Sequence, residues 1–356
     1  MQLAFELSGE HETLPKAEVF ACLDALNIVY QERTISDRLV VIDAQLEPES
    51  ELLEILSRRL GMTHHLYHVL GTSTLDATEI VKLVEDTDLS ASMDKGRTFA
   101  VRTRFAHTNR LYSKRRELLT TVWESVERKG YAVNLEKPSK TFVLILTEQQ
   151  CLFCMLLHSV GKQQFTEKKP HRRPFFSPVV IMPKIARVLV NLSGVNATTK
   201  EIFLDPFCGT GGILLEAGAV GARIIGADVQ DKMVRGAREN LAFFGLQGDF
   251  IVSDASKIPV KARSIDAIAT DMPYGRASFV SGSSSPESRS AFIERLHQDA
   301  MAEIHRVLKP GRKAVIVSNA PTVNSLFREH GFRLIEQHTY RVHKSLTRYI
   351  TVFEKA

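Results

Sequence analysis

The sequence lacks the features that place a protein in a membrane or outside the cell. No apolar run reaches the ~20 residues that a membrane-spanning helix needs, and the first residues lack the charged start and apolar stretch of a signal peptide. Four cysteines in 356 residues are too few for a disulfide framework. The sequence therefore predicts a cytoplasmic protein in a reducing environment, and its length favours two or three domains.

Cys151 and Cys154 form a C-x-x-C, a spacing found in metal and redox sites. The surrounding "CLFCMLL" is typical of a strand, in which residues three apart point to opposite faces of a sheet. A metal or redox pair needs both thiols on one side, and the chain has no second C-x-x-C. We interpret the two residues as packed cysteines and predict no metal site.

Positive charge is in mild excess, with a net charge of +5, but it is clustered. Residues 95–116 contain eight Lys or Arg and no carboxylate, with three aromatic residues among them, and a second basic group precedes "PFFSP". Solvated faces are the simpler explanation of such clusters. Two acid-poor groups favour a surface for a polyanion instead. The predicted RNA contacts are Arg97, Arg102, Arg104, Arg110, Lys114, Arg115, Arg116, Lys168, Lys169, Arg172 and Arg173.

The pattern of elements changes along the chain. Residues 1–57 are typical of strand, helix, two strands and helix, and residues 58–160 again mix short strands and helices. Residues 161–178 are polar, basic and rich in proline, which indicates a linker. In residues 179–356 apolar strands alternate with helices, which predicts an α/β, mostly parallel, doubly wound sheet. The third strand of this sheet, "DFIVSDAS", is expected at an edge.

A glycine-rich turn, "PFCGTGG", follows the first strand of that sheet and precedes a helix. Such a turn lets the backbone approach a ligand at the carboxyl edge of the strands. The nicotinamide fingerprint G-x-G-x-x-G is broken, because Leu214 stands at the third glycine position. A phosphate-binding P-loop is excluded as well, since no Gly-Lys-Ser/Thr follows.

Carboxylates end the first three strands. Asp228 could accept hydrogen bonds from two ribose hydroxyls, Asp254 could accept one from an adenine amine, and Asp205 could face an ammonium group. Each acid alone is more often a turn or capping residue. Together they favour a ligand with hydroxyls, an amine and a positive centre but no phosphates. S-adenosylmethionine fits this description.

"TDMPYG" follows the fourth strand, which lies beside the first in a doubly wound sheet. The Asp271 carboxylate and the Met272 carbonyl can accept both hydrogens of an exocyclic amine. Pro273 fixes the turn, and the Tyr274 ring offers a face for a base flipped from its stack. An ordinary turn explains Pro273 and Gly275 but not the carboxylate and the aromatic. We interpret the motif as an amine clamp.

This motif is similar to D/N-P-P-Y, the signature of amino-group methyltransferases that use S-adenosylmethionine. "RPFFSPVVIMPKIARVLVNLSG", "FLDPFCGTGGILLEAG" and "HKSLTRYITVFEK" further resemble the tRNA guanine-N2 methyltransferases of archaeal type that act on guanosine 10. "YAVNLEKPSKTFVLIL" is similar to a THUMP domain, an RNA-binding module. The resemblance implies a ferredoxin-like domain at 1–57, THUMP at 58–160, a linker at 161–178 and a Rossmann-like methyltransferase domain at 179–356.

The resemblance implies methylation of a guanosine N2 amine in tRNA. Predicted catalytic residues are Asp271, Met272, Pro273 and Tyr274, and predicted cofactor contacts are Pro178, Asp205, Phe207, Gly209, Gly211, Asp228, Val229, Asp254, Ala255 and Asp271. Three alternatives stay open: an amino-methyltransferase of ribosomal RNA, one of adenine, or a non-catalytic RNA-binding protein. Relatives of the family include members activated by a small zinc-binding protein, and we expect such a partner at the edge strand near Phe250–Ala255.

Overall fold

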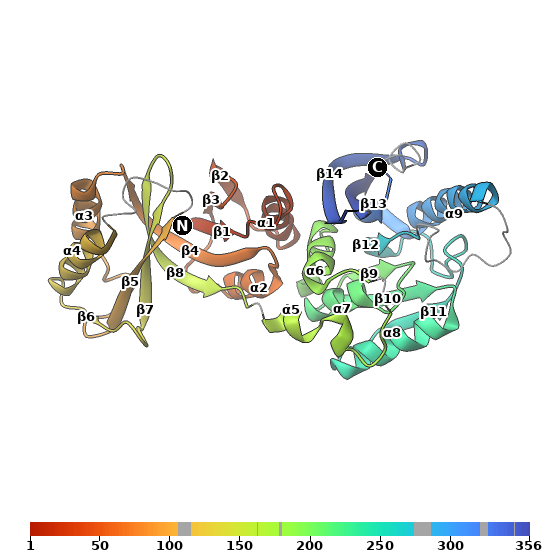
Figure 1. The fold of residues 1–356 in the computed structure, drawn as a ribbon, viewed down its shortest axis with the longest axis horizontal. Coiled ribbons are helices and arrows are strands. Elements are labelled where there is room, and N and C mark those ends of the chain that lie inside the picture. The colour runs from red at the N-terminus through yellow and green to blue at the C-terminus, as the bar shows by residue number, and fades with distance from the viewer. Residues whose placement is uncertain (106–114, 162, 178–179, 274–285, 321–326, 345) are drawn as a thin grey trace. The chain divides into compact units, whose positions relative to one another are not determined.

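The computed structural model describes the backbone of residues 1–105, 115–161, 163–177, 180–273, 286–320, 327–344 and 346–356 (Figure 1). These residues form two compact units. The first unit contains Met1–Glu10, Ile28–Ser57 and Thr63–Val160, and the second contains His11–Asn27, Arg58–Met62 and Gly161–Ala356. Each unit has a sheet of its own.

The first unit is built on an eight-stranded sheet in the order β2-β3-β1-β4-β8-β7-β5-β6. Strand β1 pairs with both β3 and β4, so segments 1–57 and 58–160 contribute to one continuous sheet. The predicted strands are confirmed, with the bounds β1 Gln2–Leu7, β2 Tyr30–Ile35, β3 Leu39–Ala44, β4 Thr63–Ser73, β5 Thr98–Phe105, β6 Ala132–Val133, β7 Lys140–Leu146 and β8 Cys151–Ser159.

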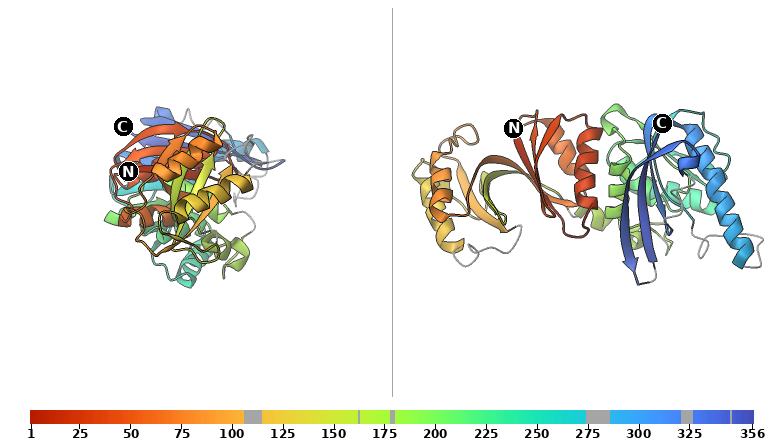
Figure 2. Two further views of the ribbon diagram at one scale, coloured as in Figure 1. Left: turned by 90° about the vertical axis from the view of Figure 1, so that its left-hand side faces the viewer. Right: turned by 90° about the horizontal axis from the view of Figure 1, so that it is seen from above.

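Helices α3 (Ala77–Asp86) and α4 (Arg115–Glu127) lie side by side against this sheet (Figure 2). Asp76 caps α3 because its carboxylate accepts a hydrogen bond from the backbone N–H of Thr78 at 2.9 Å. Helix α2 (Glu51–Arg59) precedes β4. Cys151 and Cys154 are both buried and enter different hydrophobic clusters. The prediction of two packed cysteines on opposite faces is confirmed.

The second unit has a seven-stranded sheet in the order β11-β10-β9-β12-β13-β15-β14. Strands β9 to β13 pair in parallel, and β15 pairs antiparallel with β13 and β14. The predicted doubly wound sheet is therefore confirmed, with β11 at its edge. The bounds are β9 Ile202–Asp205, β10 Arg223–Asp228, β11 Asp249–Val252, β12 Ile265–Asp271, β13 Leu308–Ser318, β14 Phe332–His343 and β15 Leu346–Lys355.

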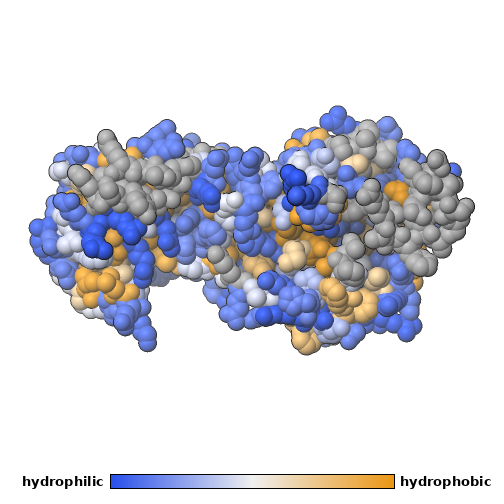
Figure 3. Space-filling view, in the orientation of Figure 1, coloured by the Kyte–Doolittle hydropathy of each residue, from blue (hydrophilic) through white to orange (hydrophobic). Residues whose placement is uncertain are grey.

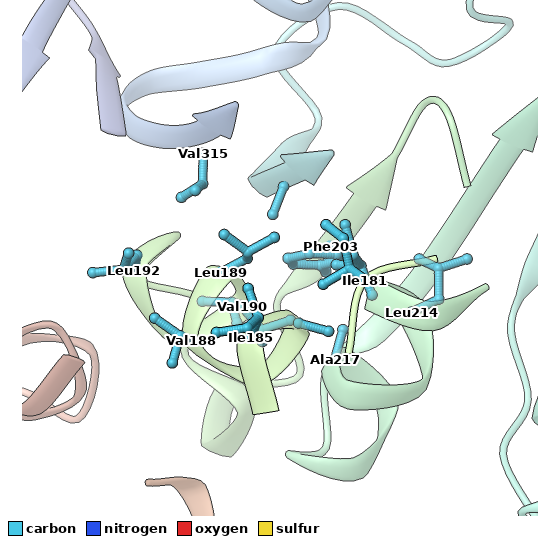
Figure 4. Close-up of a cluster of buried hydrophobic side chains, with 14 of the residues drawn as sticks. Ile181, Ile185, Val188, Leu189, Val190, Leu192, Phe203, Leu214, Ala217 and Val315 are labelled. Atoms are coloured by element: carbon cyan, nitrogen blue, oxygen red, sulfur yellow. The ribbon is translucent and has the colours of Figure 1, made fainter. Parts of the chain in front are cut away.

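Helices cover this sheet and form its main core. Side chains from α6, α7, β9 and β13 meet there, among them Leu189, Leu214, Phe203 and Val315 (Figure 4). The helical elements of the unit are α1 Leu14–Ala25, α5 Gln163–Glu167, η1 Pro170–Arg172, α6 Pro183–Leu192, η2 Ala197–Thr199, α7 Gly212–Ala219, α8 Asp231–Phe243 and α9 Pro286–Val307. In the part of the chain that the structure describes, no helix is both long and apolar enough to cross a membrane.

Helix α1 belongs to the second unit, although its sequence lies within the predicted domain 1–57. It packs on α6, and its Glu18 carboxylate is fully buried. That carboxylate accepts hydrogen bonds from the backbone N–H groups of Gly61 and Met62 and from the Asn191 amide, at 2.7–2.9 Å. The compact units thus differ from the predicted boundary at residues 57 and 58, because these buried contacts join distant segments.

Candidate active site

The carboxyl ends of β9, β10 and β12 open into a pocket of about 1010 Å³. This is the edge at which open α/β sheets bind ligands. Most of the predicted site residues line it: Asp205, Phe207, Gly209, Asp228, Val229, Asp254, Ala255, Asp271, Met272 and Pro273. Pro178 and Tyr274 lie outside the described residues. The structure therefore gathers in one pocket the strand-end acids and the described part of the proposed clamp.

The glycine turn shapes one wall of the pocket. Gly209 and Gly211 have φ values of 49° and 77°, in the left-handed region that glycine adopts without strain. Gly211 does not line the pocket, whereas Thr210 and Gly212 do. A Cβ on Gly211 would lie 2.9 Å from Leu241 Cδ1, so Gly211 allows close packing of the turn on α8. A contact of Gly211 with the cofactor stays a prediction.

Asp228 fixes the glycine turn to the end of β10. Its Oδ2 accepts a hydrogen bond from the Gly209 N–H at 3.0 Å, and its Oδ1 accepts one from the Gln230 N–H at 2.9 Å. Burial raises the pKa of Asp228, and these two hydrogen bonds oppose that shift. Each carboxylate oxygen has two lone pairs, so Asp228 keeps acceptor capacity for ligand hydroxyls.

Asp205 is the most buried acid of the pocket, with 1% of its surface exposed. Its Oδ1 accepts hydrogen bonds from the Thr270 hydroxyl at 2.6 Å and from the Phe207 N–H at 3.1 Å. Burial raises the pKa of Asp205 to about 7. Asp254, in contrast, is exposed, and its Oδ1 accepts a hydrogen bond from the Ser256 N–H at 2.8 Å.

Asp271 ends β12, and only 20% of its side chain is exposed. Burial raises its pKa to about 7, and the nearby Arg348 guanidinium opposes that shift. Hydrogen bonds hold the two residues that follow Asp271. The Met272 N–H donates to the Val317 carbonyl at 3.0 Å. The Pro273 carbonyl lies 3.2 Å from His297 Nε2 on α9. The backbone that presents the Met272 carbonyl is thus fixed on both sides.

Several pocket residues were not predicted as site residues. Phe292, Ile293 and Leu296 come from α9, and Asn319, His343, Leu346 and Thr347 come from the C-terminal strands and their connections. Residues 343, 346 and 347 lie within "HKSLTRYITVFEK", which carried part of the family resemblance. That resemblance could have indicated that this segment contributes to the site. No local pattern marked the α9 residues, because a helix face can equally well belong to the core.

The predicted RNA contacts divide by exposure. Arg97, Arg102, Arg104, Arg115 and Arg116 are exposed in the first unit. In the second unit Arg172 is exposed and Lys169 is half-buried. Arg110 and Lys114 lie outside the described residues. Hydrophilic residues cover most of the face in Figure 3, with smaller apolar groups between them.

Lys168 and Arg173 are buried, with 8% and 6% of their surfaces exposed. Lys168 Nζ lies 3.0 Å from the carboxylate of Glu216, which also pairs with Arg187 at 2.7 Å. Arg173 Nε donates a hydrogen bond to the Lys168 carbonyl at 2.9 Å. The prediction that these two side chains contact RNA is wrong, because both are buried and interact with the buried Glu216 carboxylate.

The pocket fits S-adenosylmethionine by the chemistry of its groups. Carboxylates at the ends of β9, β10 and β11 can accept hydrogen bonds from an ammonium group, ribose hydroxyls and an adenine amine. The glycine turn leaves room for a close approach of the ligand to the backbone. Among the described lining residues no lysine or arginine is present to bind phosphate.

Several known proteins are similar to this chain. Residues 170–350 match the family described as RMKL-like, methyltransferase domain. The chain is 36% identical to the tRNA (guanine(10)-N2)-dimethyltransferase of Methanothermobacter thermautotrophicus over 100% of both chains. It is 33% identical to the enzyme of that name from Pyrococcus abyssi over 98% of both chains.

The fold is similar to that of TrmN from Thermus thermophilus, with a TM-score of 0.54, 19% identity and 100% of both chains covered. This likeness concerns the fold alone. The full-length relatives and the domain match lead to one conclusion: the chain belongs to the family of tRNA (guanine-N2)-methyltransferases.

Proposed function

We propose that this chain methylates the exocyclic N2 amine of guanosine 10 in tRNA, with S-adenosylmethionine as the methyl donor. One observation carries the proposal: Asp271, Met272 and Pro273 line the same pocket as the strand-end acids Asp205 and Asp228. An amine held by the first group therefore lies next to a cofactor held by the second. The full-length relatives named for this reaction support the choice of substrate.

Residues of the chain position the amine. The Asp271 carboxylate and the Met272 carbonyl accept its two hydrogens, which directs the nitrogen lone pair toward the pocket. The bound cofactor supplies an electrophilic methyl group. Methionine at position 272 replaces the first proline of D/N-P-P-Y without loss of the clamp, because this position acts through its backbone carbonyl. Catalysis then consists mainly of positioning and of the electrostatics of Asp271.

The pocket is large for a single small molecule. Pockets for one small molecule have volumes of ~300–1,000 Å³. The volume of about 1010 Å³ is at the upper end of that range, and we propose that the pocket holds the nucleoside beside the cofactor. The relatives are named dimethyltransferases, and we propose that this chain also adds two methyl groups.

Residues 1–160 are the proposed tRNA-binding part, with a ferredoxin-like domain at 1–57 and a THUMP domain at 58–160. Their exposed arginines would contact phosphates, which position an RNA without reading its sequence. The base is then selected in the pocket. A tRNA substrate is consistent with a cytoplasmic location.

The proposed protein partner is a small zinc-binding activator that pairs with strand β11. This strand pairs only with β10 among the described residues, so its other side can accept a strand from another chain. Val252 at its end is 51% exposed.

Mass spectrometry of nucleosides tests the proposed function. Unmodified tRNA is incubated with the purified chain and S-adenosylmethionine, then digested, and its guanosine methylation is measured. We expect N2-methylguanosine and N2,N2-dimethylguanosine, both lost when guanosine 10 is replaced. Products on adenine, or on ribosomal RNA but not tRNA, would support the related amino-methyltransferases. Binding of tRNA without any product would support a non-catalytic protein.

A further inference from the structure

Arg348 on β15 contacts the carboxylate of the proposed clamp. Its Nη2 lies 3.1 Å from Asp271 Oδ2, and Arg348 is buried with 5% of its surface exposed. On the basis of the proposed function, we propose that Arg348 is a positioning residue that keeps Asp271 ionised and oriented toward the substrate amine.

The position of β15 makes this contact possible. Strand β15 lies between β13 and β14, and β13 pairs in parallel with β12. Residues 77 positions apart in the sequence are thereby brought together at the end of β12. Thr347, next to Arg348, lines the pocket, whereas Arg348 does not. Arg348 therefore acts on the substrate through Asp271 and not by direct contact.

The burial of the Arg348 guanidinium carries a cost in folding free energy. Taking a guanidinium out of water costs several kcal/mol, which one partner offsets only in part. Arg348 Nε is buried and has no hydrogen-bond partner among the described residues. A strand contact alone could be made by an apolar side chain at lower cost. A charge at this position is explained if Asp271 must stay ionised in a poorly hydrated pocket.

An aspartate at this position serves the reaction best in its ionised form. The lone pair of the amine nitrogen forms the new N–C bond, while the C–S bond breaks and its electron pair stays on sulfur. The nitrogen then carries a positive charge and must lose a proton. An ionised Asp271 can accept that proton and pass it to solvent, whereas a protonated Asp271 cannot.

Other titratable groups near Asp271 do not stabilise its ionised form as Arg348 does. Asp205 and Asp228 are carboxylates and cannot supply a positive charge. Burial lowers the pKa of His297, which contacts Pro273, and so favours its neutral form. His343 of β14 also lines the pocket. Arg348 is a cation whose guanidinium lies directly against the Asp271 carboxylate.

The test combines a pH profile with a direct titration. Arg348→Met and Arg348→Lys are compared with wild type in single-turnover methylation between about pH 6 and about pH 9. For Arg348→Met we expect the methylation rate to fall by at least about tenfold near the lower pH, which corresponds to a rise of one unit in the pKa of Asp271. At the higher pH the rate should recover toward that of wild type. Arg348→Lys should restore most of the low-pH rate. Arg333→Met, which breaks an exposed pair between β14 and Glu354 of β15, is the matched control and should keep the wild-type profile.

The titration is independent of turnover. Infrared difference spectra of wild type minus Asp271→Asn report the ionisation of Asp271, and the same subtraction is made in the Arg348→Met background. A higher midpoint in that background supports the proposal. Equal midpoints, or a loss of rate that is the same at every pH, would overturn it and leave Arg348 a strand contact. Absence of methylation by wild type would refute the proposed function, while the infrared result would still decide the role of Arg348.

Discussion

The Thr270 hydroxyl donates a 2.6 Å hydrogen bond to the carboxylate of Asp205. Asp205 ends β9, Thr270 lies one residue before the end of the neighbouring strand β12, and both are almost fully buried. This bond joins the strand that presents the amine clamp to the strand that begins the cofactor turn. The proposed positions of substrate and cofactor are therefore linked through the interior of the sheet.

Asp205→Asn should stabilise the chain at neutral pH. The asparagine oxygen can still accept from Thr270 and Phe207, but the side chain cannot ionise. The folded-state pKa of Asp205 is raised from 3.8 to about 7, so this group stabilises the fold fully below about pH 4 and loses that contribution as the pH rises through about 7. Near pH 8 the variant should exceed wild type by about 3–4 kcal/mol in the free energy of unfolding.

Denaturant unfolding between about pH 4 and about pH 8 measures this difference. Asp254→Asn is the matched control, because Asp254 is an exposed acid of the same pocket. A stability difference for Asp205→Asn that does not change with pH would contradict the prediction.

Asp271→Ala should abolish methyl transfer while cofactor affinity stays nearly unchanged. In the proposed function Asp271 serves the amine, whereas the acids of the first three strands hold the cofactor. Single-turnover rates and calorimetry with S-adenosylmethionine measure the two effects separately. A variant that transfers methyl groups at a near-normal rate would rule out the clamp.

Asp228→Ala should weaken S-adenosylmethionine binding by about 1–3 kcal/mol, the cost of leaving buried polar groups without partners. The change also removes the acceptor of the Gly209 N–H and loosens the glycine turn. Calorimetry gives the dissociation constant. Asp231→Ala, which removes the exposed partner of Arg235 on α8, is the control and should bind normally. An unchanged affinity for Asp228→Ala would show that the ribose lies elsewhere.

Arg115→Glu combined with Arg116→Glu should weaken tRNA binding and reduce its salt dependence. Each lost phosphate contact lowers the slope of log K against log salt by about 1. Filter binding over a salt series measures both. Lys200→Glu with Arg223→Glu makes the same charge change in the second unit, before β9 and at the start of β10, and is the control that should keep the wild-type slope. If the double variant at 115 and 116 keeps the wild-type slope, that cluster is a solvated face.

Val252→Lys should prevent activation by the proposed zinc-binding partner. A lysine on an edge strand opposes pairing with another strand. We expect the chain alone to be poorly soluble or weakly active, the activator to increase cofactor binding and turnover, and the variant to lose that increase. Ile335→Lys is the control, because it changes an exposed residue of β14, the strand at the other edge of the sheet. This variant should still be activated by the partner. Full activity of the chain as an isolated monomer would rule out the partner.

The sequence by itself determined the elements of both sheets and the residues at the strand ends. Alternation and helical spacing are local properties, so β9 to β15 could be predicted in order. Asp205, Asp228 and Asp271 meet because parallel strands present their carboxyl ends at one edge. That rule holds for any doubly wound sheet, and it needs no knowledge of the individual side-chain contacts.

Tertiary structure alone decided which charges are buried and which residues meet across the fold. Lys168 has the pattern of a surface lysine, yet it pairs with Glu216, which lies 48 residues away. Helix α1 joins the second unit through Glu18 and Asn191, which are 173 residues apart. Arg348 reaches Asp271 only because β15 enters the sheet between β13 and β14. Periodicity shows which face of an element is apolar, but the partner of a buried charge depends on the path of the whole chain.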